Sequence, residues 1–155
     1  MHFYRRCVPV VAALAVGAAT FASLPAGAQS TNPIEMRQKL MKQNGQAAKL
    51  GVQMLKGQQT YSPQKGEEVF TRMHDVAMKF GDYFPADSKT GHKTDAAPAI
   101  WQKPDAFKAA LVKFQTDTAA AMQAKPQDLK AFGQQFGMVA KNCKSCHQEF
   151  RVDRG

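Results

Sequence analysis

The stretch Cys143-Lys144-Ser145-Cys146-His147 lies close to the C-terminus, and the rest of the chain can be interpreted as its pocket. On a helix, residues three apart share a face and the residue four along lies beside them, so both thiols and the imidazole project toward one partner. Two thiols at this spacing followed by histidine are typical of covalent haem attachment, in which the imidazole binds the iron. The stretch therefore predicts one covalently attached haem c per chain.

Two other uses of a cysteine pair fit the chain less well. A structural zinc site needs four ligands, usually from two separated pairs, and the mature chain offers one pair. A thioredoxin-like motif follows a strand in an alternating strand and helix pattern, whereas Cys143 and Cys146 have helical patterns on both sides. A coincidental match in an exported protein is the third alternative. Haem is the reading that the final His147 and the helical context favour.

The helix that carries these cysteines has the cleanest apolar periodicity in the chain, and we expect it over about 127–151. Its apolar positions alternate steps of three and four residues: Leu129, Phe132, Phe136, Val139, Cys143, Cys146 and Phe150. The cysteines thus continue the core seam of their own helix. We therefore expect the haem inside a helical bundle, near the C-terminal end of the fourth helix.

Three further helices are predicted upstream. Asn32 before Pro33 is a good helix start and Gly57 a good stop, which predicts a first helix to about Lys56. Ser62 and Pro63 start a second that ends near Gly81, and Pro104 starts a third that breaks at 124–126. The expected inward stripe of the first helix is Ile34, Met41, Gly45, Ala48, Val52 and Leu55. That of the second is Val69, Met73, Val76 and Phe80. That of the third is Phe107, Leu111, Phe114, Thr118 and Ala121.

The segment 82–103 joins the second and third helices and shows no sustained period. A connection of this length inside a compact domain is explained by a crossover between bundle helices, with Ile100 and Trp101 pinning it to the core. No segment shows the alternation of a strand. The predicted class is all-α, an antiparallel four-helix bundle.

Residues 1–28 have the features of a cleaved secretory signal peptide. Arg5 and Arg6 precede an apolar, Ala-rich run, and 26–28 supply small residues before Gln29. We expect residues 29–155 to form one haem domain in the bacterial periplasm, with Cys7 removed. No stretch after residue 28 is apolar for long enough to span a membrane.

The charge of the chain bears on its partners. The formal net charge is +9, and loss of Arg5 and Arg6 leaves +7, which favours acidic redox partners, although a merely well-solvated surface is the alternative. The lysines are scattered, without the arginine-rich runs or basic and aromatic interleaving of nucleic-acid binders, so no nucleic acid is expected. Lys141, Lys144 and Arg151 flank the attachment site and could steer an acidic partner to the haem edge.

A C-terminal Cys-x-x-Cys-His-x-x-Phe-Arg motif, ending at Phe150 and Arg151, resembles the class II cytochromes c, the cytochrome c′ superfamily. The resemblance covers essentially the whole mature chain, including Ala99-Ile100-Trp101. Residues 38–45, Gln-Lys-Leu-Met-Lys-Gln-Asn-Gly, look like the low-spin branch, whose first-helix methionine completes iron coordination. The resemblance implies His147 as proximal ligand, Met41 as distal ligand and Arg151 near the proximal haem face. It also leaves a homodimer through the first two helices open.

Two functions follow from this resemblance. The first is an electron carrier, not an enzyme, in which an iron with His147 and Met41 as axial ligands cycles between the ferric and ferrous states with little change in geometry. The alternative is a five-coordinate cytochrome c′ that binds nitric oxide or carbon monoxide at an open distal site. Peroxidase-like catalysis would need distal acid and base groups: His74 is expected to be solvated and His92 exposed. The other methionines are expected to fill the core.

Overall fold

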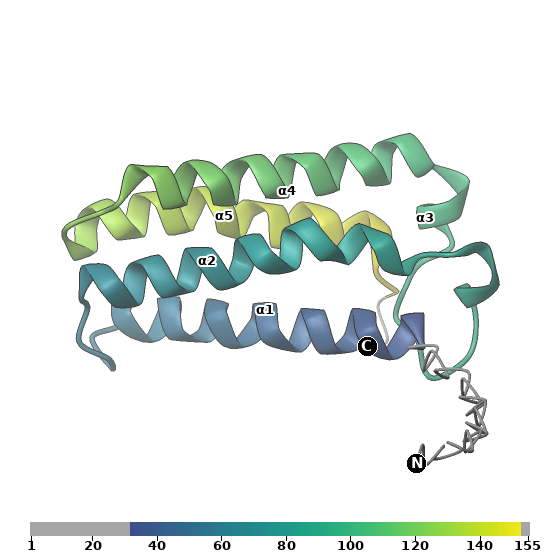
Figure 1. Ribbon diagram of the computed structural model, residues 1–155, viewed down its shortest axis with the longest axis horizontal. Helices are drawn as coiled ribbons and strands as arrows, with labels where there is room; N and C mark the ends of the chain where they lie inside the picture. The colour runs from purple at the N-terminus through teal and green to yellow at the C-terminus, as the bar shows by residue number, and fades with distance from the viewer. Residues whose placement is uncertain (1–31, 153–155) are drawn as a thin grey trace, which may run out of the picture.

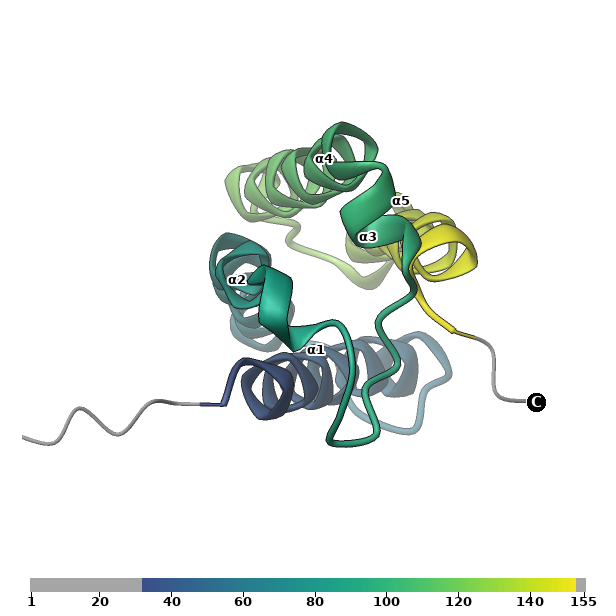
Figure 2. The same cartoon turned by 90° about the vertical axis from the view of Figure 1, so that its right-hand side faces the viewer.

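The computed structural model describes residues 32–152, so the predicted signal peptide lies outside the described residues. Its long helices are α1 (Pro33–Leu55), α2 (Pro63–Phe80), α4 (Pro104–Ala124) and α5 (Leu129–Phe150). They lie side by side, and each runs opposite to the one before it (Figures 1 and 2). Residues 32–152 contain no strand beyond an isolated bridge between Ala96 and Arg151. The predicted all-α four-helix bundle is confirmed.

The helices begin where the sequence supplies caps. The Asn32 side chain accepts a hydrogen bond from the Ile34 amide (2.9 Å), and Ser62 caps α2 through the Lys65 amide (3.3 Å). The α5 helix begins two residues later than expected, because the Asp128 carboxylate accepts from the Ala131 amide and so fixes its start. Gly57 follows α1 with a φ of 69°, a left-handed conformation that glycine adopts without strain.

The expected stripe on α1 is wrong at its C-terminal end. Val52 and Leu55 are 37% and 40% exposed, and the buried positions after the expected Ile34 are Arg37, Leu40, Asn44, Ala47, Gly51 and Met54. From Arg37 on, this stripe also alternates steps of three and four. A search for apolar periodicity does not detect it, because Arg37 and Asn44 are polar. Arg37 and Asn44 of the buried stripe line a cavity described below, together with Met41 of the expected stripe. Toward the C-terminal end of α1 the buried stripe contributes Ala47 and Met54 to the core.

The core occupies the end of the bundle that holds the α1–α2 and α4–α5 turns. Fully buried Val69, Phe70, Met73, Phe132 and Val139 form its centre, which confirms most of the expected seams of α2 and α5. Leu129 is 38% exposed and is not a core residue. On the expected seams, Phe80, Leu111, Phe114 and both cysteines are only partly buried, because they also line the cavity.

The connection 81–103 differs from the expected crossover. It stays at one end of the bundle, because α2 ends and α4 begins at that same end (Figures 1 and 2). It contains two short 3₁₀ helices, η1 (Gly81–Tyr83) and η2 (Ala86–Ser88), and the short helix α3 (Ala99–Gln102). Ile100 is buried against Phe107 and Phe150, so the predicted anchor is confirmed. Within 32–152 no helix is long and apolar enough to cross a bilayer.

Candidate haem site

A cavity of about 550 Å³ lies between α1, the C-terminal end of α2, α4, α5 and the connection. This volume falls in the range of small-molecule and cofactor pockets, about 300–1,000 Å³. Its walls are largely apolar, with Phe80, Phe84, Phe107 and Phe114 among the side chains that line it. Helix α1 contacts α5 less extensively than α2 contacts α1 or α4, so the opening lies where the bundle is least closely packed.

The three residues of the attachment motif line this cavity from α5. Cys143 and Cys146 are half-buried free thiols. His147 follows Cys146; much of its surface is exposed to solvent, and part of it lines the cavity. Burial raises the pKa of the Cys143 thiol. Burial, followed by the nearby Cys143 and Glu149, raises the pKa of Cys146. Both thiols are therefore neutral near neutral pH in the polypeptide alone.

Partial burial, and then the Arg151 charge, lowers the pKa of His147. A neutral imidazole is the form that binds a metal. The Arg151 amide donates to the His147 carbonyl (3.3 Å), and its guanidinium lies 3.5 Å from Asp95. The bridge from Ala96 to Arg151 joins the connection to α5 immediately after the motif. Arg151 and His147 thus line the same cavity, and a place for Arg151 near the proximal haem face stays a prediction.

Met41 lines the cavity from α1, opposite the α5 wall. The two helices are antiparallel, with Gly51 against Phe136 and Leu55 against Gly133. Met41 lies ten residues before Gly51 on α1, and Cys146 lies ten residues after Phe136 on α5. Met41 therefore lies at about the level of Cys146 and its neighbour His147.

The sequence reasoning missed Arg37, a buried cation on the α1 wall. Its guanidinium donates to the Tyr83 carbonyl (3.0 Å), the Ser88 hydroxyl (3.0 Å) and carbonyl (2.9 Å), and the Thr94 hydroxyl (3.2 Å). It also lies 4.6 Å from the centre of the Phe84 ring. Desolvation by burial lowers the Arg37 pKa. No carboxylate of residues 32–152 forms an ion pair with it, so no acidic side chain of the described chain balances this charge at the cavity wall.

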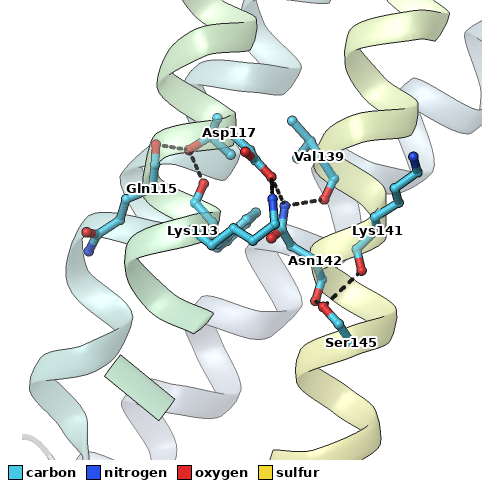
Figure 3. A network of polar contacts seen from close by, with 9 residues as sticks. Lys113, Gln115, Asp117, Val139, Lys141, Asn142 and Ser145 are labelled. Carbon is cyan, nitrogen blue, oxygen red and sulfur yellow. Dashed lines mark hydrogen bonds and ion pairs between the residues drawn. The ribbon is translucent and has the colours of Figure 1, made fainter. Parts of the chain in front are cut away.

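A polar network joins α4 to α5 next to the motif (Figure 3). The buried Asn142 amide donates to the Asp117 carboxylate (2.7 Å) and to the Val139 carbonyl (3.1 Å). Lys113 donates to the same carboxylate (2.6 Å). Partial burial raises the pKa of Asp117, but the hydrogen bonds from Lys113 and Asn142 and the Lys113 charge outweigh it, so the pKa lies below its usual value. The network fixes α5 one residue before Cys143.

The two remaining histidines of the mature chain lie away from the motif. His74 is not simply solvated as expected: it is half-buried, and its Nδ1 lies 3.0 Å from the Thr118 hydroxyl. The same hydroxyl lies 2.8 Å from the Phe114 carbonyl of α4. His92 is exposed as expected, with its Nδ1 3.9 Å from Glu35.

Comparison with known proteins identifies the family. The model of the cytochrome c′ family matches residues 32–151, nearly all of the described chain. This chain belongs to the cytochrome c′ family. A cytochrome c′ of Rhodopseudomonas palustris is 35% identical over 124 residues, covering 80% of this chain and 84% of that protein. A cytochrome c-556 of Agrobacterium fabrum is 32% identical over 135 residues, covering 86% and 91%.

Solved structures agree with this assignment. The structure of cytochrome c′ from Rhodopseudomonas palustris has a TM-score of 0.77 at 34% identity, covering 81% of this chain and 99% of that one. As a class II cytochrome c, the chain carries covalently attached haem c. The residues present fit that group: an apolar cavity, two free thiols three residues apart on one wall, a histidine beside them, and a buried cation without a carboxylate partner in 32–152.

Proposed function

We propose that this cytochrome carries single electrons in the bacterial periplasm, with Cys143 and Cys146 as the thioether residues and His147 and Met41 as the axial ligands. The observation that carries the proposal is that Met41 and His147 line one cavity from opposing helices at about one level. The relatives named cytochrome c-556 support it. Haem supplies the one-electron couple.

The chain's own residues set the conditions for this couple. A methionine thioether is a soft ligand, which favours the softer ferrous ion and raises the potential relative to a harder ligand. The apolar walls limit access of water, and the Arg37 cation is placed to pair with a haem carboxylate. Both ligands come from long helices held by the core, so little rearrangement accompanies electron transfer.

The second candidate is a five-coordinate protein that binds nitric oxide or carbon monoxide. It is favoured by the relatives named cytochrome c′ and by the unbranched, flexible Met41 side chain, which can pack over the iron without binding it. In this case the Met41 side chain would restrict the size of the distal ligand.

The optical spectrum of the holoprotein, with the variant Met41→Leu, decides between the candidates. Leucine keeps most of the apolar volume and removes the sulfur. If Met41 is a ligand, the native protein is low-spin and slow to bind carbon monoxide, and Met41→Leu is high-spin and binds it readily. Met54→Leu is the matched control, because Met54 is buried in the core and does not line the cavity. A native protein that is already high-spin, with a spectrum unchanged in Met41→Leu, would favour gas binding.

A further inference from the structure

A buried amide lies on the α1 wall beside Met41. The Asn44 side chain is 9% exposed and lines the cavity three residues after Met41, on the same face of the helix. Its Oδ1 atom is enclosed and has no hydrogen-bond donor among residues 32–152. An unpaired buried polar atom costs about 1–3 kcal/mol. Such an atom in a cofactor cavity points to a ligand.

The protein around Asn44 does not supply a partner. Asparagine within a helix usually points into solvent or bonds to the backbone of the preceding turn. Asn44 does neither, because it is buried and its oxygen is unpaired in the described part of the chain. Its cavity-lining neighbours Gly45 and Ala48 carry no polar side-chain atoms. The Cβ–Cγ torsion of asparagine is broad, so either amide atom can turn toward the cavity.

A second amide lies near the same level on the α5 wall. Continuing the register of Gly51 with Phe136 places Asn44 level with Cys143, next to Asn142. Asn142 also lines the cavity, and its Nδ2 is committed to Asp117 and Val139. Its Oδ1 accepts no hydrogen bond from residues 32–152. Asn44 and Asn142 thus line one cavity from opposing walls, and of their two amide oxygens Asn44 Oδ1 is the enclosed one without a donor in the described part of the chain.

Haem does not supply the missing donor. Its ring presents carbon and hydrogen at the edge, and its ionised carboxylates accept hydrogen bonds without donating them. A water molecule donates twice and accepts as well, and buried waters typically make about three hydrogen bonds to otherwise unsatisfied polar groups. Water is thus the small ligand whose chemistry matches an enclosed amide.

We infer that the cavity binds one water molecule at the Asn44 side chain, and that Asn44 acts through this water as a positioning residue for the redox couple. An oriented water beside the haem stabilises the additional positive charge of the ferric state. It therefore lowers the reduction potential. The inference depends on bound haem and goes beyond the proposed function, since it holds whether or not Met41 binds the iron.

The test uses the holoprotein and the variant Asn44→Leu, with Gln43→Leu as the matched control, because Gln43 is the neighbouring amide on the exposed side of α1. A high-resolution crystal structure should show a water within hydrogen-bond distance of Asn44 that is absent from Asn44→Leu. The ferrous-to-ferric equilibrium should shift about threefold toward ferrous, equivalent to about 30 mV upward for a one-electron couple. Gln43→Leu should change neither.

The inference is overturned if the native holoprotein contains no water at Asn44, or if Asn44→Leu leaves the potential unchanged. Should Asn44→Leu fail to incorporate haem, Asn44→Ala provides the same readouts with a smaller side chain. The spin state separates this test from that of the proposed function. Asn44→Leu should leave it unaltered, whereas Met41→Leu changes it if Met41 is a ligand.

Discussion

At the scale of single residues, Arg37 has a role that the sequence did not predict and that the structure shows through four hydrogen bonds. Its guanidinium bonds to three residues of the connection, Tyr83, Ser88 and Thr94, and packs over the Phe84 ring. Hydrogen bonds to a charged donor contribute about 1.5–3 kcal/mol each. Arg37 thus holds the connection against the end of the cavity.

We predict that Arg37→Met lowers the free energy of unfolding of the holoprotein by about 2–4 kcal/mol, because the buried Ser88 carbonyl and the partly buried Tyr83 carbonyl lose their donor. Denaturant unfolding followed at the haem absorbance measures it. Arg37→Lys should recover only part of the loss, since a lysine lacks the planar fork of donors. Arg72→Met is the control: its ion pair with Glu68 is exposed, and its loss should change stability by about 0.5 kcal/mol or less. Equal effects of Arg37→Met and Arg72→Met would contradict this role.

At the scale of helices, the close approach of α1 to α5 determines which part of α1 faces the cavity. A Cβ atom at Gly51 would lie 2.3 Å from the Phe136 ring, a distance that requires the ring or the helix to move. Beyond this contact, toward the N-terminus of α1, the helices leave the space that Met41 and His147 line. Gly51 therefore sets the depth of the cavity.

Gly51→Ala should destabilise the protein by about 1–3 kcal/mol through overpacking, despite the better helix propensity of alanine. Gly137→Ala, on α5 next to Phe136, is the matched control, because a Cβ there meets nothing within 4 Å. It should stabilise by up to about 1 kcal/mol. Thermal unfolding of the two variants checks the contrast, and stabilisation by both would refute the close contact.

The hydrogen-bond network between α4 and α5 leads to a prediction about how stability depends on pH. The pKa of Asp117 is below its usual value, so its carboxylate contributes stability above the unfolded pKa of about 3.9, and this is lost as the pH falls through the lower folded pKa. The stability difference between native protein and Asp117→Asn should therefore be largest near pH 7 and shrink below about pH 4. Asp75→Asn, at an exposed site on α2, is the control. A difference independent of pH would show that the charge of Asp117 contributes nothing.

At the scale of the whole molecule, positive charge surrounds the attachment motif. Lys141 and Lys144 are exposed on α5, on either side of Cys143, and Arg151 follows it. The formal charge of the chain, +9, has the same sign. We expect this charge to attract an anionic redox partner most strongly at low salt, where screening is weak.

We predict that the double variant Lys141→Glu and Lys144→Glu slows oxidation by the anion hexacyanoferrate(III) about tenfold at low ionic strength and speeds oxidation by the cation tris(phenanthroline)cobalt(III). Both effects should fade as the Debye length falls from about 30 Å at 0.01 M salt to about 10 Å at 0.1 M. Lys56→Glu, at the opposite end of the bundle, is the control. If the stopped-flow rates of the native protein are independent of salt, the two lysines do not steer the reagents and are only solvated surface residues.

The sequence by itself determined the helices, their order and the attachment motif. These features depend on local chemistry: capping by Asn32 and Ser62, apolar periodicity, and the spacing of Cys143, Cys146 and His147 on one helical face. The family follows from the same motif. The roles of Met41 and Arg151 stay predictions, and both residues line the cavity.

Only the tertiary structure decided which residues of α1 are buried in the core and which line the cavity. Both stripes have helical spacing, and the choice depends on Gly51 against Phe136, a contact between residues far apart in the chain. The same holds for Arg37 and Asn44, which look like solvent-facing residues in sequence. The connection buries Arg37, and the opposing helix encloses Asn44. A polar side chain is buried only where distant segments or a ligand supply its hydrogen-bond partners.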